Sequence, residues 1–84
     1  MNISNEDLYQ SSDFALVTSL SLFSPIIRLD TDNAGRVIFS FNKTEQLEEI
    51  VKDYWNGDLR VDPIRFYSQL KTVKSRLRSI RGGV

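Results

Sequence analysis

Apolar and polar residues alternate most regularly in the middle of the chain, over residues 36–41. The apolar members of one set lie at every second position: Val37, Phe39 and Phe41. Ile38 and Ser40, between them, fall on the opposite side of an extended chain. A period of two is typical of a β-strand with one buried face. The pattern therefore predicts a strand that directs two phenylalanines and a valine to the core.

A second apolar run, residues 26–30, follows Pro25 and also reads as a strand, with Ile27 and Leu29 on one face. The residues between the two strands, 32–35, are typical of a turn, and Gly35 adopts a positive φ at no steric cost. The two runs predict a β-hairpin. Because two strands alone are only marginally stable, the hairpin needs a helix packed on it.

Residues 45–56 supply such a helix. Their apolar positions repeat at i, i+3, i+4 and i+7: Leu47, Ile50, Val51 and Tyr54. Thr44 is a good N-cap, and Gly57 suits the left-handed position that ends many helices. The spacing predicts an amphipathic helix that covers the hairpin.

A last helix begins where Asp62 can cap it and Pro63 occupies its first turn, and it is predicted to extend to about Ser79. The apolar positions of this helix are Ile64, Tyr67, Leu70, Val73, Leu77 and Ile80. We expect them to form the stripe that docks on the core.

The N-terminal part of the chain is less regular. Ser11 and Ser12 are possible helix caps, and Asp13 suits the positive end of the helix dipole. Apolar residues over 14–23 lie near helical spacing and favour a helix, although residues 20–22 also alternate like a strand. Residues 1–10 show no periodicity and are expected to be partly disordered, and 82–84 to be a loose end. The whole chain, 1–84, is thus predicted to be a single α+β domain in the order α-β-β-α-α.

Composition excludes several classes of function. The chain has no cysteine and no histidine, so it lacks thiolate ligands, the commonest zinc ligand and the usual general base. The remaining carboxylates, serines and tyrosines form no catalytic or metal-binding motif. We therefore expect no enzyme activity, no cofactor, no metal and no small-molecule substrate.

The polar N-terminus does not resemble a signal peptide, and no apolar run spans a bilayer, so the expected location is the cytoplasm.

Charge is distributed unevenly along the chain. Residues 1–64 hold all eleven acidic residues and five basic ones, and residues 65–84 hold six basic residues and no acid. An acidic body of formal charge −6 is therefore joined to a basic tail of +6. Four cations of the last helix are spaced by three, four and three residues: Lys71, Lys74, Arg78 and Arg81. Such a spacing predicts one basic ridge, with Arg65 and Arg76 elsewhere on the surface.

A basic ridge fits the phosphates of DNA or RNA, and we expect nucleic-acid binding through Lys71, Lys74, Arg76, Arg78 and Arg81. Trp55 is a further candidate, because an exposed tryptophan stacks on bases, although tryptophans at this position more often cover the rim of the core. Two alternatives remain for the ridge. The cations are also favoured by the helix dipole and by pairing with the chain's own acids. They also suit an acidic protein partner or a homodimer in which acidic body meets basic helix.

Several motifs resemble a known family. They are Tyr54-Trp55-Asn56-Gly57, Val61-Asp62-Pro63 with Phe66, Leu70 with Lys74-Ser75-Arg76, the Ser12-Asp13 helix start, and the strand with Phe39 and Phe41. Over residues 8 to 77 the chain resembles a small bacterial and archaeal domain family of unknown function. The resemblance implies the α+β fold described above and implies no activity, no catalytic residues and no cofactor.

Overall fold

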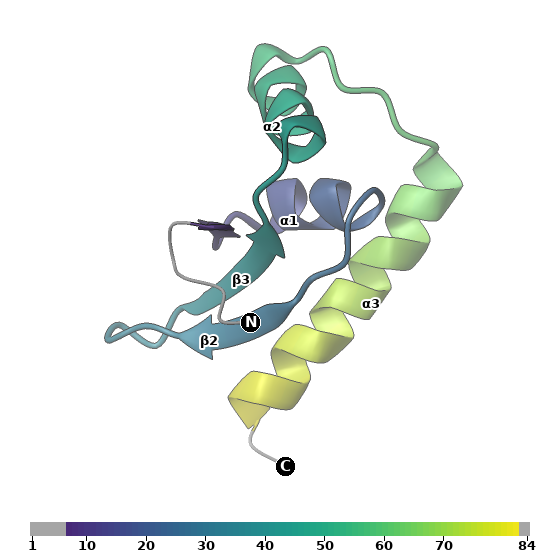
Figure 1. Ribbon diagram of the computed structural model, residues 1–84. Helices are drawn as coiled ribbons and strands as arrows, with labels where there is room; N and C mark the ends of the chain where they lie inside the picture. Colours follow the sequence, from purple (N-terminus) through teal and green to yellow (C-terminus); the bar gives the residue numbers. More distant parts are fainter. Residues whose placement is uncertain (1–6, 83–84) are drawn as a thin grey trace.

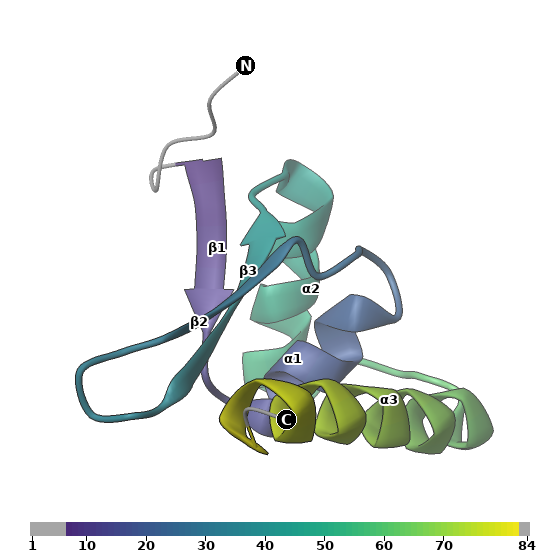
Figure 2. The ribbon, with the colours of Figure 1, turned by 90° about the horizontal axis from the view of Figure 1, so that it is seen from below.

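The computed structural model describes residues 7–82, which form a three-stranded antiparallel sheet with three helices on one side of it (Figures 1 and 2). The elements in chain order are β1 (Leu8–Ser11), α1 (Phe14–Ser21), β2 (Arg28–Thr31), β3 (Val37–Asn42), α2 (Glu45–Asn56) and α3 (Pro63–Gly82). The strand order is β1-β3-β2. The α+β class is confirmed, and the order differs from the predicted one by an additional first strand.

That strand, β1, lies where no regular element was predicted. It pairs with β3 in the register Leu8↔Asn42 to Ser11↔Phe39. Four residues are too few to display a period, and the partner that holds them is about 30 positions away in the sequence. Residues 1–6 lie outside the described residues, as do 83 and 84, while Gly82 is the last residue of α3.

The hairpin of β2 and β3 is confirmed, with Leu29 opposite Phe39. Gly35 in its turn has φ of +82°, a value that side chains with a Cβ rarely adopt. The prediction that Ile27 and Leu29 share one face of a strand over 26–30 is wrong for Ile27, because β2 begins only at Arg28. Ile27 precedes β2 and is exposed, and Ile26 packs against the core instead.

The core is built around α1, which lies between α2 and α3 in both views (Figures 1 and 2). Five successive residues of α1 are buried: Leu16, Val17, Thr18, Ser19 and Leu20. A helix buried on every side has no amphipathic period, which is why the sequence pattern was ambiguous here. The hydroxyls of Thr18 and Ser19 donate hydrogen bonds of 2.8 and 2.9 Å to the carbonyls four residues earlier, so their burial leaves no polar group unsatisfied.

Two of the three helices begin at the N-cap residue that was predicted from the sequence. Thr44 accepts a 3.1 Å hydrogen bond from the Leu47 N–H at the start of α2, and Gly57 ends that helix with φ of +75°. Asp62 accepts from the Arg65 N–H over 2.8 Å at the start of α3. For α1 the cap is Asp13, not Ser11 or Ser12, because the Asp13 carboxylate accepts from the Leu16 N–H. The Ser11 hydroxyl accepts from the Asp13 N–H and supports the cap.

The apolar stripe predicted for α3 is only partly correct. Val73 is fully buried and Leu77 packs against the core, but Ile64 and Tyr67 are 79% and 61% exposed. A helix advances by about 100° per residue, so three successive three-residue steps from Ile64 to Val73 turn the side chain by about 180°. Ile64 therefore points directly away from Val73, and Tyr67, two such steps from Val73, is turned from it by about 120°.

Candidate nucleic-acid interface

The side of α3 that faces away from the core carries both charge and apolar surface. We call this side the outward face, and its residues are Ile64, Tyr67, Lys71, Lys74 and Arg78, all exposed. It forms because helical geometry places these positions about 100° to 180° around the helix axis from Val73, whose side chain is buried. Of the four cations predicted to share a ridge, the three whose side chains are described, Lys71, Lys74 and Arg78, do share one face.

Those cations have no acidic partner among the side chains that the structure describes. Among the side chains that the structure describes, residues 7–80, only two ion pairs form, and both join neighbours within the β2–β3 hairpin. They are Arg28–Asp30 at 2.7 Å and Arg36–Asp32 at 3.4 Å. No described carboxylate lies within 4.0 Å of a basic nitrogen of α3 up to residue 80, where the described side chains end. Within this part of the chain, the acidic body therefore does not neutralise the basic helix by direct pairing.

The two remaining cations predicted for this interface differ in position. Arg76 is exposed, but helical geometry places it on the other flank of α3, where it lines a hollow with Leu29, Ser79 and Ile80. Arg81 lies within α3, and its side chain is outside the described residues. Arg65 is exposed on the same flank as Arg76.

Tyr67 was assigned to the core from the sequence and belongs instead to the outward face. The Lys71 ammonium nitrogen lies 4.7 Å from the centre of the Tyr67 ring, a cation–π distance. A helical projection of the sequence could have revealed this, since Tyr67 lies within about 40° of Lys71 and about 20° of Lys74. The face is therefore a mixed aromatic and basic surface.

Trp55 is on another helix, near the end of α2, and the fold does not bring it onto the outward face. Its side chain is 62% exposed and packs edge-on against Tyr54, with ring centres 5.0 Å apart. Tyr54 in turn donates a 3.5 Å hydrogen bond to Asp13. Burial and the charge of Asp13 raise the pKa of Tyr54. The same two causes raise the pKa of Tyr9, although a hydrogen bond between Tyr9 and Trp55 acts to lower it. These residues join the end of α2 to β1 and the start of α1.

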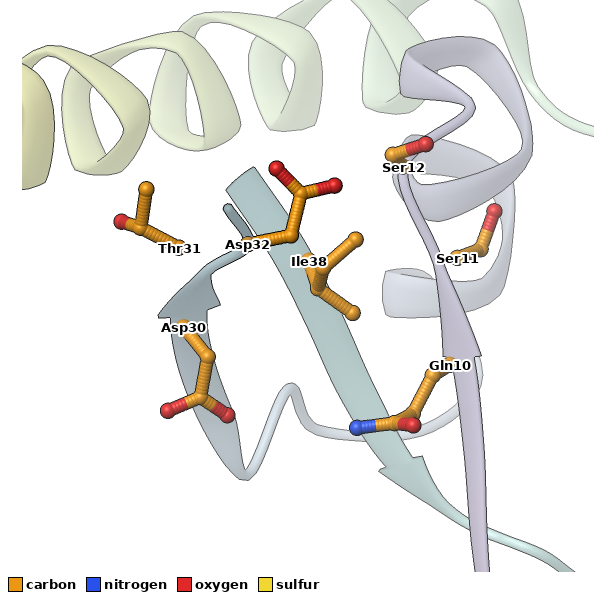
Figure 3. Close-up of a pocket in the computed structure, with 7 residues that line it drawn as sticks. All are labelled: Gln10, Ser11, Ser12, Asp30, Thr31, Asp32 and Ile38. Carbon is orange, nitrogen blue, oxygen red and sulfur yellow. The ribbon is translucent and has the colours of Figure 1, made fainter. Parts of the chain in front are cut away.

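A polar hollow of about 480 Å³ lies on the sheet between the ends of β1 and β2 (Figure 3). Gln10, Ser11 and Ser12 line it from one side and residues 30–32 from the other, with Ile38 of β3 between them. Its two carboxylates already have partners, because Asp30 pairs with Arg28 and Asp32 holds the hairpin turn. In the described part of the chain, no group of three or more acidic, histidine or cysteine side chains is arranged to hold a metal ion.

Comparison with known proteins places the chain in a family. The family described as a domain of unknown function, DUF5659, matches residues 6–79. The chain belongs to DUF5659. The match spans both strands of the hairpin and nearly all of α3, so the outward face lies within the DUF5659 domain. No curated protein and no solved structure matches the chain.

Over residues 7–82, none of the helices is both long enough and apolar enough to cross a bilayer. The longest helix, α3, carries the exposed cations described above.

Proposed function

We propose that this protein is a non-enzymatic, nucleic-acid-binding accessory protein whose contact surface is α3. The observation that carries the proposal is the set of exposed cations on one helix, Lys71, Lys74 and Arg78, without an acidic partner among the described side chains. Cations held at fixed spacing on a helix bind phosphates and release counterions. Arg76 and Arg81 extend the set along the same helix, and the cytoplasm is the proposed location.

The docked position of α3 supports this proposal. Val73 and Leu77 attach one side of the helix to the core, so the cations project from a rigid element and not from a flexible tail. Less side-chain and backbone entropy is then lost on binding than for a disordered basic segment.

Salt dependence tests the proposal directly. Labelled duplex and single-stranded oligonucleotides are titrated with the protein at roughly 50 and 200 mM salt, and binding is followed by fluorescence anisotropy. Contacts from the three cations give a log–log slope of about −2 to −3, and contacts from all five give about −4. No binding to either nucleic acid at the lower salt overturns the proposal.

Charge-reversal variants test whether α3 is the surface that contacts nucleic acid. The double variant Lys74→Glu, Arg78→Glu is expected to weaken binding and to reduce the magnitude of the salt slope by about 2. Lys52→Glu is the matched control, because Lys52 is an exposed helical lysine on α2. If both variants weaken binding equally, α3 is not the contact surface. Circular dichroism confirms that each variant is folded.

A protein-interaction module is the second candidate, favoured by the exposure of Trp55. Tryptophan is enriched among the residues that dominate protein interfaces, and this one is 62% exposed beside Tyr54. The simplest such interaction is a homodimer in which the acidic body of one copy binds the basic helix of the other. Light scattering at low and high salt tests it, since a dimer held by charge dissociates as salt rises, and a monomer at both salt levels excludes it.

A further inference from the structure

Apolar and basic residues occupy separate halves of the outward face of α3. Ile64 and Tyr67, 79% and 61% exposed, lie toward its start, and Lys71, Lys74 and Arg78 continue it toward the C-terminal end. Tyr67 and Arg78 are separated by about 16 Å along the axis, and their directions differ by only about 20°. The face is thus a narrow strip with an aromatic ring at one end and three cations beyond it.

Phosphate contact explains only the basic half. The backbone of a duplex presents charge and sugar to the protein, and its bases are stacked on one another, so an exposed tyrosine beside the cations adds little to duplex binding. An unpaired base has a free aromatic surface. Stacking of such bases on aromatic side chains is the main source of affinity, with phosphate contacts, in proteins that bind single strands.

The contact between Lys71 and Tyr67 favours this use of the ring. With its ammonium nitrogen 4.7 Å from the ring centre, Lys71 restricts the orientation of a side chain that lies outside the core cluster. Lys71 also places a positive charge over one face of the ring, so an unpaired base would stack on the opposite face. The ring remains 61% exposed in this arrangement.

We propose that the outward face of α3 binds single-stranded nucleic acid in preference to duplex. Tyr67 stacks on one unpaired base, Ile64 covers the neighbouring apolar edge, and Lys71, Lys74 and Arg78 contact the phosphates that follow. The inference rests on the proposed function and narrows it to one class of ligand. The basic part of the strip, about 10 Å from Lys71 to Arg78, accommodates only a few nucleotides.

The test compares a single strand of roughly 12 nucleotides, all thymidine or all uridine, with a duplex of the same length. Anisotropy titrations at low salt are run with the wild type, Tyr67→Ala and Tyr67→Phe. Tyr67→Ala is expected to weaken single-strand binding by roughly 5- to 100-fold and to leave duplex binding within about twofold. Tyr67→Phe retains the ring and is expected to retain single-strand binding.

Trp55→Ala is the matched control, because it removes an equally exposed aromatic ring from another helix, and it is expected to bind like the wild type. Tighter binding of the duplex than of the single strand overturns the inference, and so does an unchanged single-strand affinity of Tyr67→Ala. In both cases the proposed function stands if the charge reversal at Lys74 and Arg78 abolishes binding. Absence of binding to both oligonucleotides overturns the proposed function itself.

Discussion

The side-chain amide of Gln69 on α3 donates a 2.9 Å hydrogen bond to the hydroxyl of Ser21, the last residue of α1. The Ser21 hydroxyl donates in turn to the carbonyl of Thr18 over 2.8 Å. This chain of two bonds is a directional link in a contact that is otherwise mainly apolar. Together with the packing of Val73 and Leu77 against the core, this link fixes one rotation of α3 about its axis and thereby the direction in which the outward face points.

Removing either end of that link is expected to destabilise the protein. Gln69→Ala leaves the half-buried Ser21 oxygen without its donor, and the free energy of unfolding should fall by about 1 kcal/mol. Ser21→Ala should cost a similar amount. Because the two residues share one bond, the double variant should lose less than the sum of the single losses, by about 0.5–1 kcal/mol.

Urea unfolding followed by circular dichroism measures all three variants. Ser75→Ala is the control, since Ser75 is exposed on α3 and its loss should change stability by less than about 0.5 kcal/mol. Strictly additive losses at Gln69 and Ser21 would show that the bond does not couple the helices in solution.

Sequence pattern predicted the hairpin and α2 well because the decisive signals are local. Thr44, Gly57 and the turn at Gly35 act within a few residues, and the alternation in β3 is long enough to show its period. β1 and α1 were harder for opposite reasons. β1 depends on a partner strand far along the chain, and α1 is enclosed by the other elements, so neither displays the periodicity of a half-exposed element.

Alanine substitutions at Val73 and Ile64 test which side of α3 is buried. Val73 is fully buried and Ile64 is 79% exposed, although the sequence placed both on one stripe. Val73→Ala removes two methyl groups from the core and is expected to lower the free energy of unfolding by about 2 kcal/mol. Ile64→Ala removes more apolar atoms from an exposed position and should cost less than about 0.5 kcal/mol.

Thermal or urea unfolding of the two variants provides the comparison, and each serves as the control for the other. A loss at Ile64 equal to that at Val73 would mean that the start of α3 is packed in solution. The docked helix would then have a different rotation, and Tyr67 would not belong to an exposed face.

The basic residues of the candidate site could be predicted from the sequence, but its aromatic residue could not. Exposed lysines and arginines at spacings of three and four residues share a helix face whatever the core does, so Lys71, Lys74 and Arg78 were placed correctly. Tyr67 was assigned by hydrophobicity alone. Successive steps of three residues rotate a stripe around the helix, so an apolar residue two steps from Val73 no longer faces the core.

The hairpin turn should respond to pH through Asp32. Its carboxylate accepts 2.9 Å hydrogen bonds from the backbone N–H groups of Arg36 and Ala34. These bonds, together with the Arg36 guanidinium 3.4 Å away, lower the pKa of Asp32 from its ordinary value of 3.8. Because the folded state has the lower pKa, the stabilisation is fully present above the ordinary pKa and is lost as pH falls through the folded one.

Asp32→Asn removes the charge at this position, so the difference in unfolding free energy between wild type and variant should be largest near neutral pH. That difference should shrink as pH falls from about 4 towards about 2. Urea unfolding at a series of pH values measures it, with Asp58→Asn as a control that removes an exposed carboxylate outside the turn. A wild-type advantage that does not change with pH would show that the turn owes its stability to Gly35 and the backbone bonds and not to the Asp32 charge.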